Sequence, residues 1–155
     1  MNKGLTCLLF LLLLSACGGN ISYHSYQPVP NGGWRGNDTL FYPLPDSIEP
    51  GNYTVQLGIR HLESYPYRDI WLEVSHNLQD STTYQKDTLH LYLADTLGDW
   101  YGHGIGGLLQ YTADSVLEVH LQEKSNGSSF HINHLMNDTL LRSIYDVGIR
   151  LQHLP

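Results

Sequence analysis

The chain has 155 residues, of which 41% are hydrophobic and 15% are charged, and 15 acidic residues against 8 basic ones give a net charge of −7. This length suits one domain with its own hydrophobic core and leaves no room for a second. The acidic balance argues against binding to nucleic acid, and against binding to anionic lipid head groups through a basic patch.

The first residues have the pattern of an export signal. Lys3 supplies the positive start, residues 8–14 are apolar, and the sequence LSAC ends at Cys17. The apolar run is too short to span a bilayer, which takes roughly 20 residues. We therefore expect residues 1–16 to be removed, which also removes Lys3 and leaves a mature net charge of −8.

The LSAC sequence resembles a bacterial lipobox, which implies that Cys17 receives a lipid on its thiol and anchors the mature protein. The alternative is an ordinary secretory signal with a chance cysteine, and the chain leaves the cytoplasm in either case. Residues 18–20 contain no Asp, which by resemblance to known sorting patterns favours the outer membrane, facing the periplasm. The other cysteine, Cys7, lies in the signal, so the folded domain has no disulfide and no thiolate ligand.

Residues 17–30 are polar and contain Pro28 and Pro30. Because proline tolerates the edge of a sheet and not its centre, we expect a tether that can at most form an edge strand. The domain itself is expected over residues 31–155.

Period-two alternation of apolar residues dominates the domain and predicts half-buried strands. The alternating series are Tyr53, Val55, Leu57 and Ile59; Ile70, Leu72 and Val74; Leu89, Leu91 and Leu93; Leu117, Val119 and Leu121; and Val147, Ile149 and Leu151. Turn residues separate the series at short intervals, and only residues 133–144 have room for a helical turn or two. The pattern predicts an all-β domain, a jelly-roll-like antiparallel β-sandwich of about eight or nine strands.

A glycine-rich stretch runs from Trp100 to Gly107. It lacks the GK[ST] sequence and the strand-loop-helix context of a nucleotide-binding loop. We expect the glycines to leave room where strands bend or where Trp71 or Trp100 packs. The alternative is a shallow groove beside Trp100 and Tyr101 that accepts a peptide or a glycan.

No motif for catalysis or metal binding is found. Among nine histidines the metal candidates are His90, His120, His131 and His134, but the chain has no H-E-x-x-H motif. It also has no G-x-S-x-G motif, and nothing selects a pair of carboxylates for glycoside hydrolysis. The sequence predicts a protein that is not an enzyme and has no metal or cofactor.

The aromatic residues are 11 Tyr and 3 Trp against 3 Phe. Tyr and Trp combine an apolar ring with a polar tip, which suits wet interfaces and surfaces that stack on sugars. Several lie outside the alternating series, and those taken as a candidate binding surface are Trp34, Tyr65, Tyr67, Trp100 and Tyr101. The alternative is that these rings cover the ends of the sandwich.

Asp followed by Ser or Thr and then by an aliphatic residue or Thr occurs seven times. The hydroxyl residues are Thr39, Ser47, Ser81, Thr88, Thr96, Ser115 and Thr139. The pattern resembles the O-glycosylation sequon of exported Bacteroidetes proteins, which implies that these hydroxyls are candidate glycan acceptors. A structural cause is the alternative, because Asp side chains cap turns that lead into strands.

Several segments occur in the order found in one known family. They are the lipobox, Tyr23–Tyr26, Gly33-Trp34 followed by Asp38, Arg60-His61, residues 65–72 (YPYRDIWL), residues 100–104 (WYGHG) and residues 146–150 (DVGIR). YPYRDIWL and DVGIR are the most specific, and the similarity spans nearly the whole mature chain. The sequence resembles the gliding motility lipoprotein GldH family of Bacteroidetes.

This resemblance implies a small lipid-anchored envelope protein that faces the periplasm. It implies an accessory role, through protein contacts, in the gliding apparatus and its linked protein-export machinery, with no catalytic motif to transfer. Homologues also occur in bacteria that do not glide. The alternative is a carbohydrate-binding β-sandwich lipoprotein that uses Trp34, Trp100 and nearby tyrosines as stacking platforms.

Overall fold

The computed structural model describes residues 21–30, 32–80 and 82–155, in which nine strands and no helix are found. The strands are β1 (Ile21–Pro28), β2 (Leu40–Pro43), β3 (Gly51–Leu62), β4 (Asp69–His76), β5 (Gln85–Tyr92), β6 (His103–Ile105), β7 (Leu108–Leu121), β8 (Ser129–His134) and β9 (Ile144–His153). The helical turn considered for residues 133–144 does not form, because β8 ends there and bends follow it. Within the described ranges no helix is long and apolar enough to cross a bilayer. The predicted signal peptide, the predicted lipid site Cys17 and the candidate glycosylation site Ser81 lie outside those ranges.

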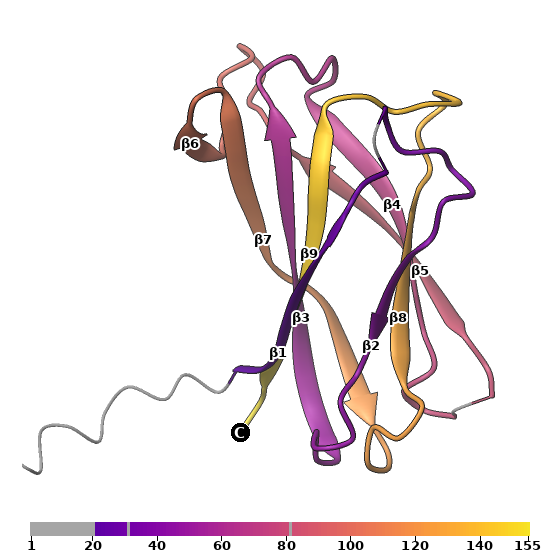
Figure 1. Ribbon diagram of the computed structural model, residues 1–155. Helices are drawn as coiled ribbons and strands as arrows, with labels where there is room; N and C mark the ends of the chain where they lie inside the picture. Colours follow the sequence, from indigo (N-terminus) through magenta and orange to yellow (C-terminus); the bar gives the residue numbers. More distant parts are fainter. Residues whose placement is uncertain (1–20, 31, 81) are drawn as a thin grey trace, which may run out of the picture.

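The strands form two antiparallel sheets that pack face to face (Figure 1). One sheet has the order β1-β9-β3-β7-β6 and the other has the order β2-β8-β4-β5. Four strand pairs are nested along the chain: β1 with β9, β2 with β8, β3 with β7, and β4 with β5. The chain is thus one long antiparallel hairpin, closed between β4 and β5 and wound into a sandwich. This is the topology of a jelly roll, and it confirms the predicted fold class.

The core lies between the sheets and is built by the predicted alternation. The inward residues of β3, from Tyr53 to Ile59, are at most 2% exposed, and the same holds for alternate residues of β4 and β9. Burying an aliphatic side chain of this size contributes about 1.5–3 kcal/mol, so these series account for much of the stability of the fold. The largest fully buried side chains are Trp34, Tyr42, Leu57, Ile59, Ile70, Leu72, Leu93, Leu121, Phe130, Ile132, Leu141 and Ile149.

Strand β1 shows which of the two expected forms, tether or edge strand, the described part of residues 17–30 takes. It pairs along its length with β9, from Ile21 opposite Gln152 to Pro28 opposite Asp146, and it forms one edge of the five-stranded sheet. The segment expected to be a tether over residues 17–30 is therefore an edge strand from Ile21 onward, the second of the two forms considered for it. The sheet domain begins earlier than residue 31.

The two ends of the sandwich are formed by different turns and loops. The described chain enters at Ile21, and its C-terminus lies at the same end (Figure 1). We call this the entry end; it holds the turns at residues 44–50, 77–84 and 122–128. The opposite end, which we call the far end, holds the loops at residues 63–68, 93–102 and 135–143 and the short strand β6.

Three tyrosines lie in the core, although their polar tips favour wetter places. Tyr42, Tyr53 and Tyr65 are each at most 3% exposed. Their hydroxyls donate to backbone carbonyls: Tyr42 to Val147 at 2.8 Å, Tyr53 to Glu49 at 2.7 Å and Tyr65 to Asp69 at 3.0 Å. These bonds remove the penalty of burying a phenol, so tyrosine serves here as a core residue.

Three histidines are also buried, and they predict sensitivity to acid. His61, His76 and His134 are at most 3% exposed, and each has one buried ring nitrogen without a hydrogen-bond partner among the described residues. Burial lowers the pKa of each imidazole below its ordinary value of 6.5.

The unfolded chain consequently binds more protons than the folded one just below pH 6.5, so stability is lost as the pH falls through that value. We expect the free energy of unfolding in urea to be lower at pH 5.5 than at pH 8. A flat or rising stability between these two values would contradict this, and working above pH 5 keeps ordinary carboxylates ionised.

Candidate functional site

Of the five aromatic residues taken as a candidate binding surface, the structure buries some and leaves others accessible. Trp34 is 0% exposed and Tyr65 is 3% exposed, so neither offers a face to a ligand, and their assignment to a surface is wrong. Trp100 is half-buried, while Tyr67 and Tyr101 are exposed. The three that remain lie at the far end of the sandwich.

Trp34 is buried because its loop is bound to another loop. Its backbone exchanges two hydrogen bonds with Leu141, at 2.8 Å and 2.7 Å. Its indole nitrogen donates to the carbonyl of Asp38 at 2.6 Å, and its own carbonyl lies 3.0 Å from Nε2 of the buried His134. The ring therefore closes the core under two long loops, which alternation along strands does not reveal.

The far end is held together by contacts between aromatic rings. The ring centroid of Trp100 lies 4.6 Å from that of His61, which in turn lies 5.8 Å from that of Tyr65. Tyr67 packs edge-on against Tyr65, and its hydroxyl donates to the Asp138 carboxylate at 2.6 Å. This hydrogen bond raises the pKa of Tyr67. Loops from three parts of the chain are thus fixed relative to one another.

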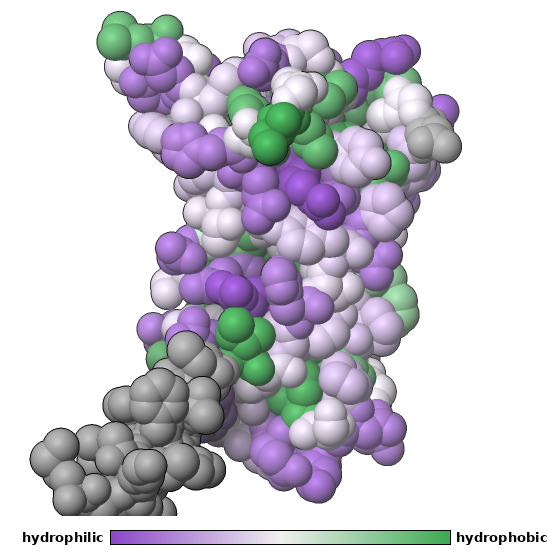
Figure 2. Space-filling view, turned by 60° about the vertical axis from the view of Figure 1, so that its left-hand side comes forward, coloured by the Kyte–Doolittle hydropathy of each residue, from purple (hydrophilic) through white to green (hydrophobic). Residues whose placement is uncertain are grey.

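Two aliphatic side chains project from the same end of the sandwich, one from the loop at residues 93–102 and one from β6. Leu97 is 87% exposed and Ile105 is 93% exposed. In Figure 2 hydrophobic residues stand out among polar ones at the end of the molecule away from the grey segment. Tyr101, Tyr67 and Leu62 are also exposed and belong to the same end. Burying two aliphatic side chains in a contact contributes about 3–6 kcal/mol, enough to matter for association.

The local sequence explains why both side chains point outward. Oδ1 of Asp95 accepts hydrogen bonds from the backbone N–H groups of Leu97 and Asp99, at 2.8 Å and 2.9 Å, and so closes a tight turn with Leu97 at its tip. Ile105 ends β6 just before Gly106 and Gly107, whose φ angles of +66° and +81° form a two-residue hairpin turn. The glycine-rich stretch therefore serves the turn, in agreement with its predicted structural role.

The Asp-Ser/Thr pattern has a structural cause at several positions. Asp38 accepts a hydrogen bond from the N–H of Arg35, and Asp80 accepts from Thr82, as Asp95 does from Leu97. At the same time the candidate hydroxyl residues within the described ranges are all exposed, namely Thr39, Ser47, Thr88, Thr96, Ser115 and Thr139. Turn capping and exposure of the acceptor hydroxyl thus occur together.

The outer face of the five-stranded sheet brings together three of the segments that carry the family resemblance. Arg60 of β3 faces Asp146 of β9, with Nε to Oδ1 at 2.7 Å and Nη2 to Oδ2 at 2.5 Å. The Arg60 guanidinium also lies 4.6 Å from the ring centroid of Tyr26 on β1. A Cβ atom at Gly58 or Gly148 would collide with the Tyr26 ring, so the two paired glycines leave the space that it occupies.

We call the contact of Tyr26, Arg60 and Asp146 the β1 latch, because it fixes the edge strand to the centre of the sheet. Asp146 is 4% exposed, and its burial raises the pKa of its carboxyl although Arg60 acts in the opposite direction. The segments around Tyr26, Arg60 and Asp146 therefore have a structural role. Their spacing in the sequence gives no sign that they meet.

A second exposed aromatic face was missed in the sequence. On the outer face of the four-stranded sheet, Phe41, Trp71 and Tyr92 are between 41% and 52% exposed. The alternation in the sequence already indicates this face, because Trp71 and Tyr92 occupy the outward positions between the apolar residues of β4 and β5. From the sequence we expect Trp71 only as a packing residue.

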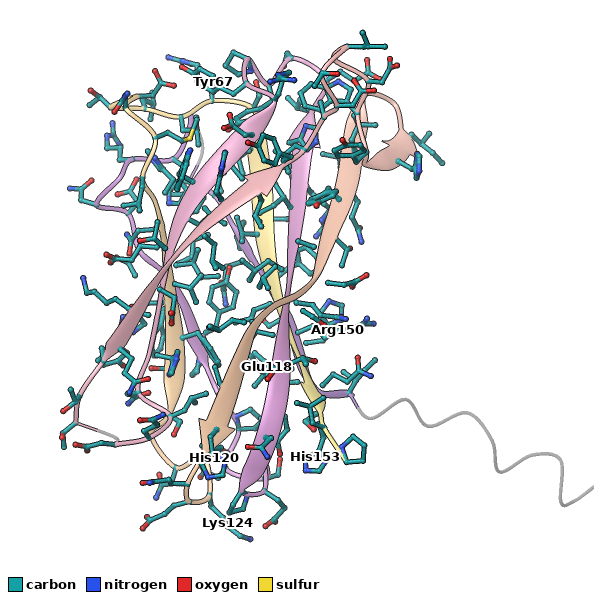
Figure 3. The ribbon with its side chains drawn as sticks, turned by 180° about the vertical axis from the view of Figure 1, so that it is seen from behind. Tyr67, Glu118, His120, Lys124, Arg150 and His153 are labelled. Carbon is teal, nitrogen blue, oxygen red and sulfur yellow. The ribbon has the colours of Figure 1, made fainter. Side chains whose placement is uncertain are left out.

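The described residues include no group of three or more His, Cys, Asp or Glu placed to hold a metal ion. Of the four histidines considered as ligands, His134 lies in the core under Trp34, and His90 and His131 lie on the outer face of the four-stranded sheet. His120 lies near the entry end (Figure 3), where its Nδ1 is 2.8 Å from Oδ1 of Asn52. The structure does not bring them together.

Comparisons with known proteins place the chain in a family. A search of solved structures matches it to the Eiger TNF from S. frugiperda, with 14% sequence identity, coverage of 88% of each chain and a TM-score of 0.34. No curated protein matches the sequence. The model of one protein family, described as GldH lipoprotein, matches residues 21–151, which is nearly the whole described chain. The chain therefore belongs to the GldH lipoprotein family.

Proposed function

We propose that this lipoprotein is anchored to the outer membrane through Cys17, faces the periplasm, and acts without catalysis by binding another envelope protein of the gliding and protein-export machinery. The observation that carries the proposal is the exposure of Leu97 and Ile105, 87% and 93%, at the far end, where Trp100 packs on His61. Exposed aliphatic tips on fixed loops are typical of a protein contact, since they lose little conformational entropy on binding.

The position of the anchor supports this orientation. Four residue steps separate Cys17 from Ile21, so they span at most about 14 Å even when fully extended. Ile21 begins β1 and pairs with Gln152 near the C-terminus, at the entry end (Figure 1). A lipid on Cys17 would therefore hold this end close to the membrane. Strand β7 has 14 residues and runs between the two ends, so the ends lie at most about 43 Å apart along it. The loops of the far end would then lie away from the membrane, where another envelope protein can reach them.

We expect a Leu97→Ser/Ile105→Ser variant to fold normally, because both side chains are almost fully exposed, and to lose its partner. In the native host, a mild crosslink followed by purification of the wild-type lipoprotein should recover one or more envelope proteins. The variant should recover at least about tenfold less, since a loss of 1.4 kcal/mol already weakens binding tenfold and the two side chains contribute more than that. Motility and secretion of the complemented deletion strain should fall in parallel.

The matched control is Phe41→Ser, which removes an exposed aromatic ring on the four-stranded sheet and leaves the far end intact. Purification of free lipoprotein alone from the wild-type strain would contradict the proposal. Equal recovery of the partner with the Leu97→Ser/Ile105→Ser variant would contradict the place of the contact.

We further propose that one or more of the exposed Asp-Ser/Thr hydroxyls carries an O-linked glycan in the native host. Exposure of Thr39, Ser47, Thr88, Thr96, Ser115 and Thr139 supports this, because a glycosyltransferase needs access to the hydroxyl. Ser81 belongs to the same set. The intact mass of the mature protein should exceed that of the polypeptide plus its lipid, and equality of the two would eliminate glycosylation.

The carbohydrate-binding alternative loses its original support. Trp34 is buried in the core, and Trp100 packs against His61 rather than standing free. Neither ring is placed as a stacking platform for a sugar.

A further inference from the structure

One exposed aromatic ring, that of Trp71 on the outer face of β4, is held in place by its neighbours. It stacks on His90 of β5 with ring centroids 3.9 Å apart and an interplanar angle of 9°. Nε2 of His90 lies 2.6 Å from the Asp69 carboxylate, which fixes the imidazole. One face of the Trp71 ring is therefore held in place before any ligand arrives, while 41% of the residue remains exposed.

A cavity of about 350 Å³ adjoins this ring. Its walls are Asp69, Trp71, Leu135, Met136 and Asn137. In the order β2-β8-β4-β5, β5 lies on one side of β4, and the segment that continues β8 lies on the other. The N–H of Leu135 donates to the carbonyl of Trp71 at 2.8 Å, so Leu135 and Met136 flank Trp71 on the side away from His90.

The walls of the cavity combine three kinds of surface: an indole ring, two aliphatic or thioether side chains, and a carboxylate and an amide. No Lys or Arg lies among its walls, and the protein is acidic overall, so an anionic ligand is disfavoured. One oxygen of the Asp69 carboxylate is bonded to His90. A purely apolar side chain from a partner would cover the other oxygen and the Asn137 amide without giving them a hydrogen-bond partner, which is costly. A ligand with one apolar face and several hydroxyl groups satisfies all three surfaces.

We propose that this cavity binds a neutral glycan, with the C–H face of one pyranose ring stacked on Trp71 and its hydroxyls bonded to Asp69 and Asn137. The ligand class is a chain of equatorially linked, uncharged pyranoses, because their flat rings expose apolar faces. The site differs from the far-end contact of Leu97 and Ile105, and it does not rest on it. It also differs from the stacking residues expected from the sequence, Trp34 and Trp100.

The test is calorimetric titration of the mature lipoprotein, in a detergent without sugar head groups, with cellohexaose and fully N-acetylated chitohexaose as neutral probes and hexagalacturonate as the anionic one. At least one neutral probe should bind and hexagalacturonate should bind more weakly. Trp71→Ala should reduce the affinity at least about tenfold. Phe41→Ala is the matched control, because Phe41 is an exposed ring on the same sheet that contacts His131 and not the cavity, and it should leave the affinity unchanged.

Both variants should stay folded, with the free energy of unfolding in urea lowered by about 1 kcal/mol or less, so that a loss of binding is not a loss of folding. Absence of binding by both neutral probes would overturn the proposal. So would binding that Trp71→Ala leaves intact, or tighter binding of hexagalacturonate than of either neutral probe. None of these results bears on recovery of a crosslinked protein partner, which tests the proposed function separately.

Discussion

Replacing Trp34 by alanine is expected to lower the free energy of unfolding by about 3–5 kcal/mol, the usual cost of removing a buried Trp or Phe side chain. The indole is fully buried and joins two loops through its hydrogen bond to Asp38 and its backbone pairing with Leu141. Domains of this kind have total stabilities of about 5–15 kcal/mol, so the variant should be marginal. Urea unfolding followed by tyrosine and tryptophan fluorescence measures the change.

Trp71→Ala is the matched control, because Trp71 is 41% exposed on a sheet face. It should cost about 1 kcal/mol or less. A loss below about 1 kcal/mol for Trp34→Ala would contradict the core role of Trp34, since truncating a buried ring always leaves a cavity.

Breaking the β1 latch by Arg60→Met is expected to cost about 2–4 kcal/mol. The substitution leaves the Asp146 carboxylate, 6% exposed at its side chain, without the guanidinium that pairs with it. Loss of one partner of a buried ion pair costs about 3–5 kcal/mol. The lower range applies here because the Arg60 side chain is 33% exposed and water replaces part of the contact. The contact of Arg60 with the Tyr26 ring is lost as well.

The double variant Arg60→Met/Asp146→Leu distinguishes the cost of the unpaired Asp146 carboxylate from the cost of losing the contact between Arg60 and Tyr26. It removes the charge that Arg60→Met leaves unpaired, so it should recover to within about 1 kcal/mol of the wild type. Arg142→Met, at an exposed arginine, should change stability by less than about 0.5 kcal/mol. If the double variant were less stable than Arg60→Met, the account of Asp146 as a buried charge would be wrong.

The fold follows from local patterns to a large extent. Alternation in residues 53–59 and 147–151 marks strands with one buried face, and the structure confirms these series. Nested pairing joins strands that lie far apart in the chain, such as β1 with β9, so the turns between consecutive strands do not determine it. The start of the sheet at Ile21 was harder to see, because an edge strand of polar and aromatic residues has only one pairing partner and little apolar signal.

The site was harder to predict than the fold because it depends on contacts between distant loops. Trp34 and Tyr101 both lie in irregular segments rich in glycine, yet one is in the core and the other is exposed. The difference comes from pairing with Leu141, more than 100 residues away along the chain. Leu97 and Ile105 look like ordinary apolar residues until the turns that carry them are placed, and Trp71 was overlooked although alternation puts it outside.

The central claim is that the far end of the sandwich meets a protein partner while the entry end stays near the membrane. A photo-crosslinking amino acid placed at Ile105, and separately at the exposed Glu123 of the entry end, tests it most directly in living cells of the native host. The claim predicts a discrete adduct with one envelope protein at position 105 and none with that protein at position 123. Absence of an adduct at position 105, or the same adduct at both positions, would contradict it.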